Sequence, residues 1–97
     1  MSTRERSIAQ NAAMKASRER RLAQVRPGWW VFSYGPTDLG SFEKVTATTT
    51  FTDPAANRAT VRLTVIDPAG RRVEIENVGG HPTWCVTTAE ARRTGLI

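Results

Sequence analysis

The chain has 97 residues, of which 39% are apolar, 24% charged and 7% aromatic, with 14 Lys and Arg against 9 Asp and Glu. This length supports one small domain, and no apolar run approaches the ~20 residues that a membrane-spanning helix needs. The single cysteine, Cys85, excludes an internal disulfide, and with only one histidine the usual intramolecular zinc sites are excluded too. We therefore expect no metal, no cofactor and no membrane partner, and the N-terminus lacks the apolar segment of a signal peptide. A reducing cytoplasm is the simplest compartment for such a chain.

Positive charge is concentrated at the start of the sequence. Residues 1–26 hold seven basic and two acidic residues, for a net charge of +5, whereas residues 27–97 hold seven of each. Pro27-Gly28 is a strong chain break between the two parts. The sequence thus predicts a basic helical arm over residues 1–26 and a small neutral β domain over residues 27–97. Twelve of the 14 basic residues are Arg, a usage that GC-rich codons favour, so we interpret the gene as actinobacterial or actinophage.

The arm has the composition of a helix with a weak apolar face. Thr3 to Val25 contains no Gly or Pro and consists mainly of good helix formers, which predicts a helix over this segment. Apart from Ile8, the apolar side of that helix contains only alanine, so it could bury little area. Two interpretations stay open. The arm is either a solvated leader or a segment that becomes ordered on an anionic partner.

The remaining sequence predicts five short antiparallel strands. Thr, Val and aromatic residues dominate these segments, as is typical of strands. The segments are Trp29–Tyr34, Phe42–Thr52, Ala59–Val65, Arg72–Glu76 and Thr83–Thr87, separated by the loops 35–40, 53–57, 67–70 and 79–82. In the second strand we expect Val45, Ala47 and Phe51 to face inward. The third and fourth strands alternate apolar and polar residues around a type I turn at 67–70, which predicts a β-hairpin.

A short helical turn is expected at the C-terminal end. Thr87 and Glu90 have the spacing of a capping box, so Ala89–Arg93 would form one or two helical turns that end at Gly95. The expected fold class is therefore mainly β with an N-terminal helix (α+β). The sheet would be a five-stranded antiparallel meander, either an SH3-like small barrel or an open curled sheet.

The junction of the arm and the first strand is the leading candidate site. Four of the seven aromatic residues follow the basic arm directly, and aromatic rings flanked by arginine can stack unpaired bases. Because a small one-sided sheet cannot bury both faces of a strand, we expect one of the two adjacent tryptophans to lie near the surface. The alternative is that both are core residues. The predicted nucleic-acid-binding residues are Lys15, Arg18, Arg20, Arg21, Arg26, Trp29 and Trp30.

The other polar residues indicate neither catalysis nor metal binding. His81 precedes a proline in a Gly-Gly-His-Pro turn and is expected to be exposed, whereas Cys85 alternates with Trp84 and lies on the opposite face. Glu74 and Glu76 have the spacing of a solvated strand face, with Arg62 as a cross-strand partner. No catalytic constellation is present, so we expect a protein that is not an enzyme.

Two functional hypotheses follow from the sequence. The first is a small binding module that contacts DNA or RNA, with the basic residues on phosphates and a tryptophan on a base. The second is a protein-interaction or virion-structural component, whose arm docks on a neighbouring protein or whose sheet edge forms a homo-oligomer.

Overall fold

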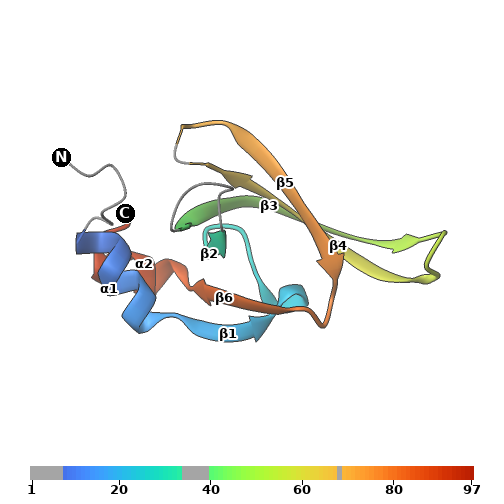
Figure 1. Ribbon diagram of the computed structural model, residues 1–97, viewed down its shortest axis with the longest axis horizontal. Coiled ribbons are helices and arrows are strands. Elements are labelled where there is room, and N and C mark those ends of the chain that lie inside the picture. The colour runs from blue at the N-terminus through green and yellow to red at the C-terminus, as the bar shows by residue number, and fades with distance from the viewer. Residues whose placement is uncertain (1–7, 34–39, 68) are drawn as a thin grey trace.

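The computed structural model describes residues 8–33, 40–67 and 69–97. Its elements are α1 (Ile8–Ala16), β1 (Arg18–Arg21), the 3-10 helix η1 (Leu22–Gln24), β2 (Trp30–Ser33), β3 (Ser41–Asp53), β4 (Arg58–Ile66), β5 (Arg72–Val78), β6 (Pro82–Val86) and α2 (Thr88–Thr94). The strands form one antiparallel sheet in the order β1-β6-β2-β3-β4-β5. The α+β class is as expected, and of the two sheet forms predicted the open one is found (Figure 1).

The N-terminal segment departs from the prediction of one helix from Thr3 to Val25. The helix ends at Ala16, and Arg18–Arg21 instead forms a sixth strand that pairs with β6. These four residues have little intrinsic preference for a strand. They adopt it because β6 offers unpaired backbone groups, and pairing satisfies the groups of both strands. The predicted meander is therefore found only in β2 to β5, because β6 returns to lie between β1 and β2.

Each face of the sheet carries a hydrophobic core of its own. The first core consists of Leu22, Val25, Val31, Val45, Val61, Leu63, Val65 and Cys85. The second core consists of Ala13, Phe42, Val86 and Ala91, with Trp30 and Phe32 packed against it. The premise that such a small sheet buries one face only is therefore wrong. The curled sheet and η1 enclose the first core, whereas α1 and α2 cover the second.

The two helices lie against each other at one end of the molecule, and the β3–β4 hairpin extends away from them (Figure 1). Ala13 and Ala91 are both fully buried in the second core, and such small side chains let the helices approach closely. The Gln10 side chain fixes α1 on β3, since its amide donates to the Phe42 carbonyl at 3.2 Å and accepts from the Phe42 amide at 2.8 Å. The alanine-rich face of the predicted arm thus packs against other parts of the same chain.

The hairpin formed by β4 and β5 confirms the alternation in the sequence. Val61, Leu63 and Val65 are buried, Leu63 lies opposite Ile75, and the Gly70 amide donates to the Asp67 carbonyl at 2.8 Å across the turn. Arg62 lies opposite Glu76 and contacts its carboxylate at 2.6 Å, as the sequence predicts.

The β3 strand contains one irregularity that the alternation did not reveal. The pairing with β4 shifts between Val45 and Ala47, as in a β-bulge. The extra residue reverses the alternation, so Thr48 rather than Ala47 lies opposite Leu63 and Ala47 is exposed. The expectation that Ala47 faces inward is wrong for this reason.

The C-terminal helix confirms its capping signals. The Thr87 hydroxyl accepts from the Glu90 amide at 3.2 Å, and the Glu90 carboxylate accepts from the Thr87 amide at 2.8 Å. Gly95 ends the helix with φ 89°. Tyr34, residues 35–39 of the predicted 35–40 loop, and Pro68 lie outside the described residues.

We predict that Gly28→Ala destabilises the protein more than Gly70→Ala. Both glycines have a left-handed φ, +91° and +83°, which costs an alanine about 1–2 kcal/mol. Only at Gly28 would the new Cβ also lie 2.8 Å from the Thr88 hydroxyl, whereas a Cβ at Gly70 would meet no atom of the described residues within 4 Å beyond its chain neighbours. Urea denaturation of the two variants measures the difference in the free energy of unfolding.

The double variant Gly28→Ala/Thr88→Ala separates the two causes. Removal of the hydroxyl is expected to bring the cost at Gly28 close to the cost at Gly70. Equal losses for the two single variants would contradict the close contact between Gly28 and α2.

Candidate nucleic-acid interface

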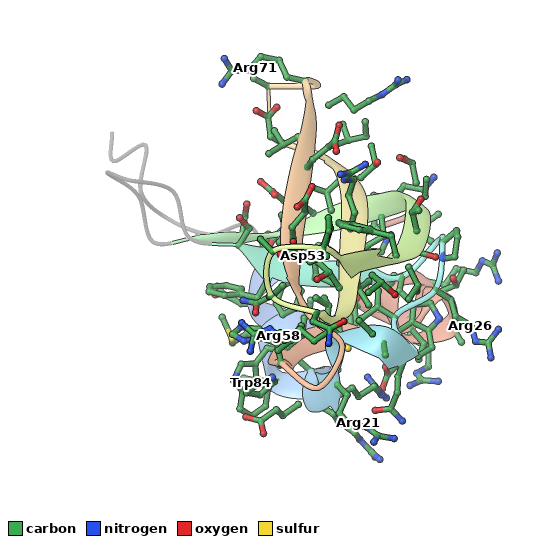
Figure 2. All side chains as sticks on the ribbon, turned by 90° about the vertical axis from the view of Figure 1, so that its right-hand side faces the viewer. Arg21, Arg26, Asp53, Arg58, Arg71 and Trp84 are labelled. Atoms are coloured by element: carbon green, nitrogen blue, oxygen red, sulfur yellow. The ribbon has the colours of Figure 1, made fainter. Side chains whose placement is uncertain are left out.

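Four of the predicted phosphate-binding side chains are exposed. Lys15 lies on α1, Arg18 and Arg21 on β1, and Arg26 directly after η1. Within the part of the chain that the structure describes, none of the four has a carboxylate within 4.0 Å. The labelled Arg21 and Arg26 side chains point outward, Arg21 at the bottom of the view and Arg26 at its right side, whereas Arg71 lies at the top (Figure 2). These four cations are therefore available to an external anion.

Most acidic groups of the described residues are already engaged with an arginine. The ion pairs are Arg62 with Glu74 at 3.1 Å and with Glu76 at 2.6 Å, Arg71 with Asp67 at 3.2 Å, and Arg20 with Glu90 at 3.6 Å. Glu19 on β1 is an exposed acid outside these pairs. The positive charge along β1 and the segment after η1 is thus compensated less than the charge on β4 and β5.

Arg20 differs from its neighbours because its side chain is held inside the chain. Its guanidinium donates to the Cys85 carbonyl at 3.2 Å and contacts the Cys85 sulfur at 3.5 Å. The same group lies 3.6 Å from the Glu90 carboxylate and 5.2 Å from the centre of the Trp29 ring. These contacts join β1 to β6 and α2. Arg20 therefore stabilises the site instead of offering a free charge.

The Arg20 contacts also affect two titratable groups. Burial raises the pKa of the Glu90 carboxyl, but the hydrogen bond from the Thr87 amide and the charge of Arg20 outweigh burial, so the net shift is downward. Burial raises the pKa of the Cys85 thiol, against the opposing effect of Arg20. At neutral pH the thiol is therefore protonated, which makes it a weak nucleophile.

The two predicted tryptophans are both partly buried, on opposite faces of the sheet. Trp29 packs against the first core and Trp30 against the second. The buried Nε1 of Trp30 has no hydrogen-bond partner among the residues that the structure describes. The two-core architecture explains why neither ring is freely exposed, since each face of β2 has its own apolar layer.

Arg26 and Trp29 come together in a shallow groove. Its volume is about 550 Å³, and it is lined by Ala23, Gln24, Val25, Arg26, Pro27, Trp29 and Thr48. With Arg20 over the Trp29 ring, three of the predicted residues lie near one another. Arg21 and Trp84 point to other sides of the molecule than Arg26 (Figure 2).

Trp84 is the aromatic residue that the site prediction missed. It is 50% exposed, more than any other tryptophan of the chain. The sequence places Trp84 on the same side as Val86, and the register confirms this, yet Val86 is fully buried. Alternation reports which face a side chain occupies. It does not report where the helices that cover that face end.

No protein-family model matches the chain, and the search of curated proteins found no match to it. Among the described residues, no helix is long and apolar enough to cross a membrane. The same residues contain no group of three or more His, Cys, Asp or Glu side chains that could hold a metal ion.

We predict that Arg20→Ala lowers the free energy of unfolding by about 1–3 kcal/mol, because it removes the hydrogen bond to the Cys85 carbonyl and the ion pair with the part-buried Glu90. Arg20→Lys should recover part of this loss, since an ammonium cannot contact both groups in the geometry of a guanidinium. Arg21→Ala is the matched control, and its effect should stay within about 0.5 kcal/mol because the side chain is exposed. Equal effects of Arg20→Ala and Arg21→Ala would contradict the structural role of Arg20.

The lowered pKa of Glu90 predicts a pH dependence of stability. A carboxyl whose pKa is lower in the folded state stabilises the protein above its unfolded pKa, near 4.5, and this contribution is lost as the pH falls through the folded pKa. The free energy of unfolding should therefore fall with acid more steeply in the wild type than in Glu90→Gln. Chemical denaturation at pH values from about 3 to 7 measures both slopes. Equal slopes for the wild type and Glu90→Gln would show that Glu90 does not contribute to the pH dependence of stability.

Proposed function

We propose that this protein is a non-enzymatic binding module that contacts the phosphate backbone of a nucleic acid through Arg18, Arg21 and Arg26, with Lys15 as a further contact. The observation that carries the proposal is the set of exposed cations on β1 and next to η1 that have no carboxylate within 4.0 Å among the described residues. Arginine suits this role because its planar guanidinium donates two parallel hydrogen bonds to a phosphate.

The spacing of the cations favours an extended anion over a single small one. Arg18 and Arg21 are three positions apart on the strand, which corresponds to about 10 Å along the chain. Side chains three residues apart on a strand also point to opposite faces. The two guanidinium groups therefore suit different phosphates of a polymer.

The burial of the Cys85 thiol, which is the potential nucleophile, supports a function in binding without catalysis. The Cys85 thiol is fully buried, and its pKa is raised by burial. His81 is exposed on the turn before β6. An active site would need a nucleophile within hydrogen-bond reach of its base.

A second candidate function is protein interaction through the edge of the sheet. β1 lies at the edge of the sheet, so no strand within residues 8–33, 40–67 and 69–97 pairs with one side of its backbone, and such edges can pair with a strand from another chain. Ile8 on α1 is 89% exposed and could contribute an apolar contact. The free cations favour the nucleic-acid proposal, because charged edge strands also resist such pairing.

We predict that the triple variant Arg18→Ala/Arg21→Ala/Arg26→Ala binds nucleic acid more weakly and with a smaller dependence on salt. Each lost phosphate contact lowers the slope of log K against log salt by about 0.7–0.9, so three contacts should lower it by about 2–3. Fluorescence anisotropy of labelled DNA and RNA at several salt concentrations measures this slope.

The matched control is Arg72→Ala/Arg92→Ala/Arg93→Ala, which removes the same charge from exposed positions on β5 and α2. If binding depends on the cations of β1, this control should keep most of the slope. Equal losses of slope in the two triple variants would show that only the net charge of the protein matters. That result would contradict a defined interface. Absence of binding at low salt would remove the nucleic-acid proposal altogether.

A further inference from the structure

An apolar cleft lies beside the exposed ring of Trp84. Its volume is about 230 Å³, and its apolar walls include Leu22, Phe32, Leu63, Ile75 and Trp84. A second hollow of about 240 Å³ adjoins it and shares Phe32 and Trp84. The Trp84 ring therefore stands between two hollows with half of its surface in solvent. We call the first of these two hollows the Trp84 cleft.

The Trp84 cleft has polar groups at its edge. His81, Thr83 and Asn77 also line it, and their side chains include hydrogen-bond donors and acceptors. Its size is below the roughly 300 Å³ at which pockets for drug-sized ligands begin. The cleft thus suits one flat ring with polar atoms at its rim.

In the pairing of β1 with β6, Arg21 is the free cation closest to the Trp84 cleft. Glu19 lies opposite Trp84, and Arg21 lies opposite Pro82, so Arg21 is the diagonal neighbour of Trp84 on the same face. Diagonal neighbours are about 7–8 Å apart, which a long side chain can span. Arg21 makes no ion pair within the described residues. An anionic group attached to a ring in the cleft would therefore find a partner.

We propose that the Trp84 cleft binds an unpaired base of a single-stranded nucleic acid, with Trp84 stacking on the base and Arg21 contacting an adjacent phosphate. This inference rests on the proposed function and names the form of nucleic acid that the protein prefers. In a duplex both faces of a base are already stacked, so only an unpaired base can offer a face to Trp84. A peptide side chain could also fill an apolar cleft, but the free cation and the polar rim favour a base joined to a phosphate.

The test compares three ligands on the full-length protein. They are a labelled single-stranded oligonucleotide, the same backbone with abasic sites in place of bases, and the matching duplex. Base stacking on one aromatic ring is worth roughly 5- to 150-fold in affinity. We therefore expect the single strand to bind more tightly than the abasic strand by a factor in this range.

Variants at Trp84 assign this difference to the cleft. Trp84→Ala should remove the preference for the single strand over the abasic strand, whereas Trp84→Phe should retain most of it because a ring remains. Val73→Ala is the control for loss of a part-exposed apolar side chain, since Val73 is 39% exposed on β5. Circular dichroism of each variant establishes that the fold is retained.

The outcomes separate this inference from the proposed function. Salt-dependent binding that needs Arg18, Arg21 and Arg26 but is unchanged by Trp84→Ala would overturn the stacking site and leave the phosphate contacts. No binding of any of the three ligands would overturn both. Chemical shifts of the Trp84 indole would give a third outcome. If a blocked leucine peptide perturbs them at a lower concentration than the oligonucleotide does, the cleft belongs to a protein partner and the inference is wrong.

Discussion

The position of β6 between β1 and β2 is the constraint on which the rest of the structure depends. Cys85 and Val86 are adjacent in β6, and both are fully buried because they face different cores. The strand leads directly into α2, which packs against α1. Its pairing with β1 therefore joins the two ends of the described chain and holds both cores together.

The same arrangement decides how the basic residues are used. β1 runs beside β6, so Arg20 reaches the Cys85 carbonyl and Glu90 and becomes part of the scaffold. Arg18 and Arg21 lie on the same four-residue strand and stay exposed. One short segment thus contains both an arginine that stabilises the fold and the cations proposed to contact phosphate. A residue count cannot distinguish these roles, since they depend on what lies across the strand.

The sequence predicted the kinds of residue in the candidate site, but it did not predict every residue that contributes to it. The excess of positive charge in residues 1–26 and the aromatic residues after it pointed to Arg26 and Trp29, which line one groove. The prediction missed Trp84, whose exposure depends on where the helices stop covering the sheet. It also expected one of the adjacent tryptophans, Trp29 or Trp30, to lie near the surface, whereas two apolar layers partly bury both.

The sequence alone determined the features that depend on neighbouring residues. The β4–β5 hairpin, its turn and the capped C-terminal helix all follow from alternation and from side chains that bond to backbone within a few residues. Only the tertiary structure decided that Arg18–Arg21 is a strand, that β3 contains a bulge and that both sheet faces are covered. The physical reason is that backbone pairing and burial between segments distant in sequence outweigh local preferences, which differ by less than about 1 kcal/mol per residue.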